Sequence, residues 1–123
     1  MIILISNLIG CCAIFVFNVE DAAQVISNRF NTPFYLVFGL AVICGVCIEA
    51  AVEQFKMGRW YIVPFYVAAF ILCGARHCIA EFCYMLAARQ LHLQQLEYLI
   101  IVILGNSIGS ILLYTWKEKI KQL

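Results

Sequence analysis

The sequence predicts an all-α membrane protein with a single transmembrane domain, 1–123. Of its 123 residues, 65% are hydrophobic and only 12% are charged, whereas an ordinary soluble domain is about half apolar and about a quarter charged. Four long apolar stretches account for most of this excess. The composition argues against a soluble enzyme and against a disordered or disulfide-stapled secreted chain. The net charge of +1 argues against a nucleic-acid-binding protein.

The four stretches define the expected helices, which run over residues 2–17, 34–52, 60–72 together with 77–88, and 98–116. The first begins beside Met1 without the basic region of a signal peptide, so we interpret it as a membrane helix whose beginning is missing. The third stretch is too long for one straight span of about 30 Å. It should therefore be two helical pieces with a break at Gly74. Irregular backbone at membrane depth is tolerated only beside protein or a wetted cavity, so the broken helix should line a cavity.

Basic residues in the connections predict the orientation. With four crossings, one side of the membrane carries five of them: Lys56, Arg59, Lys117, Lys119 and Lys121. The other side carries Arg29 and Arg89. We therefore expect a multi-pass protein of the inner (plasma) membrane with both termini in the cytoplasm. Residues 18–33 should form an external loop or short surface helix, and residues 89–97 a polar connection.

A short pattern, Asn-x-Ile-Gly, occurs in both the first and the last apolar stretch. It comprises residues 7–10, ending at Gly10, and residues 106–109. The two expected helices cross the membrane in opposite directions, and matching motifs on such helices are typical of inverted-topology repeats in transporters. On this interpretation the last three segments form one repeat, and the first segment ends a preceding one.

Three ionisable residues, Arg76, His77 and Glu81, follow the expected break. Such residues are costly at membrane depth, which favours a functional role, although they could instead lie near the lipid headgroups. Histidine can exchange a proton near neutral pH. Because Glu81 lies four residues after His77, both should share a helix face, where the carboxylate would favour the charged imidazolium. Arg76 would oppose this effect if it pointed into the same cavity.

Small and amide residues in the last span predict close helix packing. Gly105 and Gly109 form a GxxxG pattern, which lets two helices approach. Between them, Asn106 needs a buried partner, either across the helix interface or at the ring of His77. Glu49 is expected at the membrane interface, solvated or paired with Arg59 or Arg76.

Seven cysteines are scattered over the apolar stretches, including a Cys-x-x-Cys pair at residues 44 and 47. The pair has no second pair or histidine nearby in the sequence, so we interpret the cysteines as small apolar side chains and expect no metal site and no cofactor.

Residues 74–81 (GARHCIAE) resemble the Gly-Phe-Glu-His-x-Ile-Ala-Asn signature of the formate/nitrite transporter family. Residues 104–109 (LGNSIG) look like that family's Gly-Asn-x-Ile-Gly motif on its sixth helix, and residues 7–10 are similar to the partner motif on its third helix. The resemblance covers nearly all of this chain but only the second half of a family member. Two positions differ from the signature, where Arg76 replaces an acidic residue and Glu81 replaces an asparagine.

The resemblance implies half of an aquaporin-like bundle of two inverted repeats with a broken fifth helix, assembled as a homopentamer in the full-length form. It implies transport of small monovalent weak-acid anions, such as formate or nitrite, with a proton as a second partner and no enzymatic activity. By the same resemblance His77 is the central pore histidine and Asn106 its hydrogen-bond partner. Phe70 occupies the aromatic constriction, and Arg59 adds to the field that attracts anions.

Two other readings of the chain stay open. It could be a truncated or degenerate transporter fragment without flux of its own, because the N-terminal half of the family fold is missing from the sequence. Alternatively, it could be a membrane subunit that binds a haem or quinone through His77. A haem usually takes a second axial ligand or an open distal pocket, and the other histidine, His92, falls in an expected external connection.

Overall fold

The computed structural model describes residues 19–89 and 91–122, and within them all the regular structure is helical. The elements in chain order are α2 (Val19–Phe30), α3 (Phe34–Lys56), the 3₁₀ turn η2 (Trp60–Ile62), α4 (Val63–Leu72), α5 (Cys78–Ala87) and α6 (Leu93–Lys121). The expected first helix, 2–17, and with it Gly10, lies outside the described residues.

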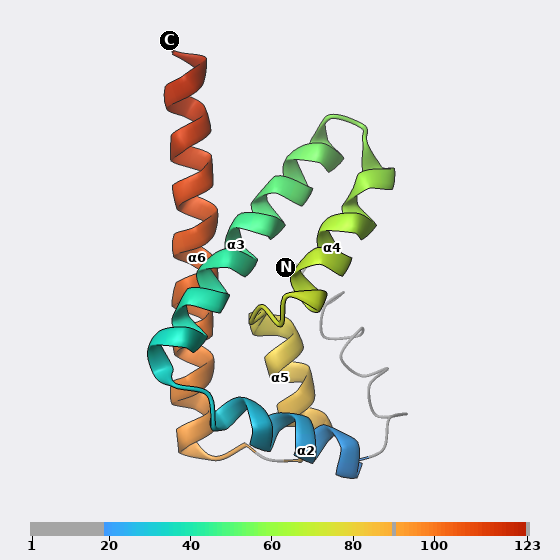
Figure 1. Ribbon diagram of the computed structural model, residues 1–123, viewed down its shortest axis with the longest axis vertical. Coiled ribbons are helices and arrows are strands. Elements are labelled where there is room, and N and C mark those ends of the chain that lie inside the picture. The colour runs from blue at the N-terminus through green and yellow to red at the C-terminus, as the bar shows by residue number, and fades with distance from the viewer. Residues whose placement is uncertain (1–18, 90, 123) are drawn as a thin grey trace.

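The two longest helices, α3 and α6, cross at close range and form the centre of the fold (Figure 1). Glycines make this approach possible. A Cβ added to Gly109 would lie 2.1 Å from the carbonyl oxygen of Val42, and one added to Gly45 would lie 2.1 Å from that of Asn106. At Gly105 an added Cβ would lie 2.6 Å from the Cβ of Ala41. Backbone therefore packs directly on backbone at the crossing, as small residues allow.

The third apolar stretch is broken into two short helices, as its length predicts. Gly74 has a φ of 66°, a conformation that glycine adopts readily, and it turns the chain after α4. In Figure 1, α4 descends beside α3 to the middle of the molecule, where α5 begins and continues to the lower end. The start of α5 therefore lies at mid-height, close to α3 and α6.

The short helix α2 lies across the lower end of the molecule and packs against α5 (Figure 1). Of the two alternatives expected over residues 18–33, a loop or a short surface helix, the structure shows the helix. One face of this helix is buried. α2 contributes Ala22 and Ile26 to a buried apolar cluster, which also contains Val37, Ala41, Met85, Ala87, Ala88, Tyr98 and Val102. This cluster fixes the lower half of the molecule beneath the break.

Helix boundaries differ from the expected ones mainly at the last helix. α6 begins at Leu93, inside the segment expected to be a polar connection. The side chain of Gln95 accepts a hydrogen bond of 2.7 Å from the backbone N–H of His92, the residue before the helix. This contact satisfies a backbone donor at the helix start, so the polar residues there cap a helix instead of forming a loop. α3 likewise continues to Lys56, beyond the expected end at 52.

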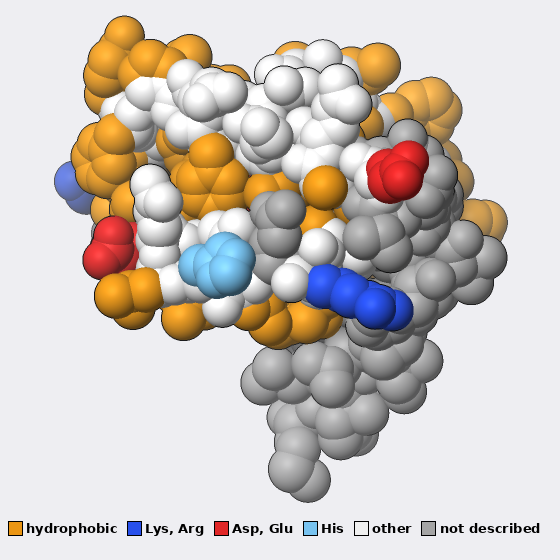
Figure 2. Space-filling view, turned by 90° about the horizontal axis from the view of Figure 1, so that it is seen from below, with side chains coloured by type: hydrophobic (Ala, Val, Ile, Leu, Met, Phe, Trp, Pro, Cys, Tyr) orange, Lys and Arg blue, Asp and Glu red, His pale blue; other side chains and the backbone are white. Residues whose placement is uncertain are grey.

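Two of the described helices, α3 and α6, are long and apolar enough to cross a membrane. With 23 residues, α3 is about 34 Å long at a rise of 1.5 Å per residue. Large apolar side chains stay exposed on several helices, for example Leu72 at 85% and Phe65 at 73%. Seen from below, apolar side chains spread over much of the described surface, with few charges among them (Figure 2).

Candidate functional site

His77 lies at the break, as the residue that caps the N-terminus of α5. Its backbone is extended, with φ −102° and ψ 120°, and its Nδ1 accepts a hydrogen bond of 3.3 Å from the backbone N–H of Ala80. A neutral imidazole that accepts at Nδ1 carries its proton on Nε2. The ring stacks on Phe70 of α4, with the centroids 5.7 Å apart and the planes at 12°. The ring is therefore held between the end of one short helix and the start of the next.

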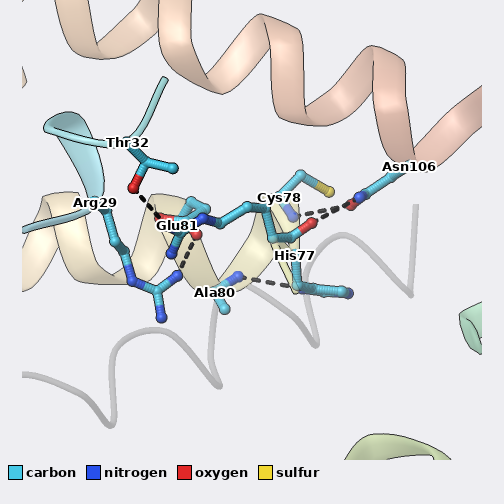
Figure 3. Close-up of polar contacts among 8 residues, drawn as sticks. Arg29, Thr32, His77, Cys78, Ala80, Glu81 and Asn106 are labelled. Atoms are coloured by element: carbon cyan, nitrogen blue, oxygen red, sulfur yellow. Dashed lines mark hydrogen bonds and ion pairs between the residues drawn. The ribbon is translucent and has the colours of Figure 1, made fainter. Parts of the chain in front are cut away.

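Asn106 of α6 holds the chain on both sides of His77. Its Nδ2 donates to the carbonyl oxygens of Arg76 and Ala41, both at 2.8 Å, and its Oδ1 accepts from the backbone N–H of Cys78 at 3.0 Å. Figure 3 shows the amide reaching the main chain beside His77 while the ring extends in another direction. The expected bond from Asn106 to the His77 ring is thus replaced by bonds to the flanking backbone, since the break leaves those polar groups without helical partners.

Two cavities meet at His77. One, of about 410 Å³, lies between α3 and α4, and its other lining residues, Phe70 and Val67 among them, are apolar. The second, of about 420 Å³, lies against α6 and is lined by His77, Asn106, Ser107 and Ser110 together with apolar residues. Besides His77, the two cavities share Ile48 of α3. His77 thus lines both cavities, of which the second also has polar side chains in its lining.

Glu81 does not pair with His77, contrary to the expectation from their spacing. It is fully buried and forms an ion pair with Arg29 of α2. Arg29 also lies over the ring of Tyr84, with its Cζ 4.9 Å from the centroid. Because His77 caps the helix with an extended backbone, the two side chains do not follow the regular i, i+4 geometry. The carboxylate therefore joins α5 to α2 instead of tuning the imidazole directly.

Arg76 is buried as well, with 8% of its surface exposed. Its Nη2 donates to the hydroxyl of Thr32, which follows α2, at 3.1 Å (Figure 3). Its backbone is tied to α3 by a bond of 3.4 Å from its N–H to the carbonyl of Leu40 and to α6 by Asn106. Arg76 and His77 thus come from the same turn but make different contacts.

The structure brings together most of the predicted site residues. His77, Asn106, Phe70, Arg76 and Glu81 surround the break, and Gly105 and Gly109 pack against α3 beside it. Arg59 is separate. It precedes η2 at the opposite end of α4, is exposed, and donates to the Oε1 of Gln54 at 3.4 Å.

The remaining candidate residues lie elsewhere. Glu49 is half-buried on α3 and forms no ion pair with a described residue, whereas Glu53, one turn later, pairs with Lys117 of α6. The thiols of Cys44, Cys47, Cys73 and Cys78 are free. Cys83 is disulfide-bonded, so the interpretation of every cysteine as a small apolar side chain is wrong at this position.

Sequence reasoning did not identify three polar residues near the break: Arg29, Thr32 and Tyr98. In the sequence they lie 17 to 52 positions from the residues that they approach in the structure. No short-range spacing pattern therefore identifies them. The one available signal was Arg29 itself, one of the two basic residues on the side predicted to be external.

Comparison of the chain with models of known protein families, with curated proteins and with solved structures finds no match.

Proposed function

We propose that this chain is a membrane-embedded unit for the passage of small monovalent weak-acid anions, such as formate or nitrite. The proposal follows the resemblance of the three motifs and is supported most directly by one observation, the position of His77. The imidazole lies at the break of a helix and lines both an apolar cavity and a partly polar one. A solute in either cavity would therefore meet this side chain.

The electrostatics at the break suit an anion. α5 begins at this point, and the N-terminus of a helix carries a partial positive charge. Half-helices that end near the middle of a membrane are a known device for ion and substrate sites in transporters. Arg76, the residue before His77, carries a full positive charge on a buried side chain that is directed to Thr32 beside α2. Together these groups would lower the cost of bringing a negative charge into an apolar surrounding.

Proton transfer completes the proposed passage. A bare anion is expensive in the apolar cavity beside Phe70, whereas the neutral weak acid is not. An imidazolium at His77 would give its proton to the anion, directly or through water, and become neutral imidazole. The acid crosses uncharged, releases its proton on the far side, and the imidazole takes up a new proton. The stacking on Phe70 and the bonds from Asn106 to the backbone on either side of His77 would keep the ring in place.

Membrane insertion and orientation belong to the same proposal. The exposed apolar side chains of α3, α4 and α6 would contact lipid or other helices. The loop between α3 and η2 and the end of α6 lie at the same end of the molecule (Figure 1), and this end carries the five basic residues that predict the cytoplasmic side. We propose a plasma-membrane protein that forms a homopentamer in its full-length form, with each protomer completed as an aquaporin-like pair of repeats.

Uptake of labelled formate into proteoliposomes at a series of pH values tests the role of His77. We expect uptake to rise as the external pH falls, and the variant His77→Gln to lose most of this dependence because glutamine cannot exchange a proton. His92→Gln is the matched control, since His92 is exposed at the start of α6. It should behave as wild type.

The outcomes separate the alternatives. An unchanged pH profile in His77→Gln contradicts proton exchange at this residue. Absence of formate uptake by the wild-type chain favours the fragment reading. A Soret absorbance band that disappears in His77→Gln would instead support a haem-binding subunit.

A further inference from the structure

The upper end of the molecule in Figure 1 carries an excess of positive charge. It contains residues 53–61 and 113–122, among which five are basic and two are acidic. The opposite end has the reverse balance, because residues 19–33 and 88–97 contain two basic and three acidic residues. The excess charge therefore differs in sign between the two ends of the molecule.

Both carboxylates at the upper end already have a cationic partner. Lys117 of α6 pairs with Glu53 of α3, and Lys121 pairs with Glu118 of its own helix. The other basic residues at this end are exposed and form no ion pair with a described residue; they are Lys56, Arg59 and Lys119. The described part of the chain thus leaves three positive charges here without a carboxylate.

The packing of α3 against α6 brings these three cations to one level. Both helices run upward in Figure 1, and the ion pair of Glu53 with Lys117 joins them near their upper ends. Lys56 follows Glu53 by one helical turn, and Lys119 lies in the turn that follows Lys117. Arg59 lies in the connection directly after α3. The cations therefore surround one end of two packed helices.

Aromatic side chains at the same end indicate the depth of a membrane interface. Trp60, Tyr61 and Trp116 are each more than half exposed, and the rings of Trp60 and Tyr61 lie edge to face with their centroids 6.3 Å apart. Tryptophan and tyrosine are enriched at the level of the lipid headgroups. In the proposed membrane orientation the three cations would lie at this level, where long basic side chains can extend to a phosphate.

We propose that this end of the molecule binds the headgroups of anionic phospholipids through Lys56, Arg59 and Lys119. A zwitterionic headgroup carries a cation beside its phosphate, whereas an anionic lipid brings a net negative charge to the three cations. An acidic protein segment would have the same sign of charge, but the exposed aromatic rings beside the cations favour a lipid. The inference rests on insertion of the chain into a membrane, which is part of the proposed function, and not on the passage of formate.

Intrinsic fluorescence tests the proposal, because the two tryptophans of the chain, Trp60 and Trp116, both lie at this end. The purified chain is placed in nanodiscs of equal parts phosphatidylglycerol and phosphatidylcholine. Bromine, which quenches tryptophan, is carried on the acyl chains of one lipid or of the other, so the two samples have the same net charge. We expect stronger quenching by brominated phosphatidylglycerol, with a local excess of this lipid of about fivefold, the effect of one basic residue near an anionic surface. Raising the salt from about 0.1 M to about 1 M shortens the screening length from about 10 Å to about 3 Å and should bring the excess close to one.

Variants locate the effect. The triple variant Lys56→Gln, Arg59→Gln, Lys119→Gln keeps both tryptophans and should lose most of the preference. Arg89→Gln is the control, because it removes an exposed basic residue at the opposite end, and it should keep the wild-type ratio.

The proposal is overturned if the two brominated lipids quench the wild-type chain equally, which would leave the cations for an acidic protein, or if the triple variant keeps the full preference. Absence of quenching by both lipids would contradict membrane insertion and this proposal with it. A lipid preference in a chain that passes no formate would support the lipid surface and contradict only the proposed passage.

Discussion

Replacement of Asn106 by alanine should destabilise the break more than any other single change on α6 outside the glycines. The substitution removes three hydrogen bonds. The carbonyl of Ala41 lies inside α3, where the helix supplies another donor. The carbonyl of Arg76 and the N–H of Cys78 lie at the break and would lose their partners. Each buried unpaired group costs about 1–3 kcal/mol, so we expect a loss of about 2–6 kcal/mol in the free energy of unfolding.

Denaturation by SDS in mixed micelles measures this loss, and hydrogen exchange of the 73–80 segment locates it. The amide of Cys78 should exchange at least about tenfold faster in Asn106→Ala, because local opening no longer breaks a side-chain bond. Ser107→Ala is the control. Its hydroxyl is exposed and bonds only to the carbonyl of Ile103 in its own helix, at 2.8 Å, so the change should stay within about 0.5 kcal/mol. Equal stability and equal exchange in the Asn106 variant would refute the assignment of the amide as the clamp of the break.

Two other contacts predict measurable effects on stability. Gly109→Ala places a Cβ 2.1 Å from the carbonyl oxygen of Val42 and should lower the free energy of unfolding by about 2–3 kcal/mol in SDS denaturation. In the control Gly39→Ala, on α3, the added Cβ meets nothing within 4 Å, so the change should stabilise the protein by about 0.5–1 kcal/mol. Similar values for the two variants would contradict the close crossing of α3 and α6. Arg29→Gln leaves the buried carboxylate of Glu81 unpaired and should cost about 3–5 kcal/mol. In a double-mutant cycle, Arg29→Gln with Glu81→Gln should cost clearly less than the sum of the single changes, and simple additivity would show that the pair is not coupled.

The sequence predicted the parts of the fold that depend on local pattern. Apolar length indicated α3 and α6, and the excessive length of the third stretch together with Gly74 indicated the break between α4 and α5. The GxxxG pattern indicated close packing of α6, which the structure places against α3. Each of these features depends on residues that are close together in the sequence, so a local sequence pattern is enough to predict it.

The contacts of the site depend on tertiary packing and could not be predicted in the same way. The partner of Glu81 is Arg29, which is 52 positions away, and nothing in the spacing of α5 selects it over His77. The sequence implied that Asn106 needs a buried hydrogen-bond partner. It could not show that the partners are backbone groups and not the His77 ring, because this depends on the path of the chain after the break. The start of α6 was missed because polar residues that cap a helix have the same composition as a loop.

Osmotic swelling of proteoliposomes tests the central claim, that the break at His77 passes small weak-acid anions. Vesicles with the purified chain are mixed into hyperosmotic ammonium formate, and light scattering follows their re-expansion against that of empty vesicles and against ammonium gluconate. The account predicts faster re-expansion than in empty vesicles with formate, and none with gluconate. Re-expansion in formate at the rate of empty vesicles would contradict it.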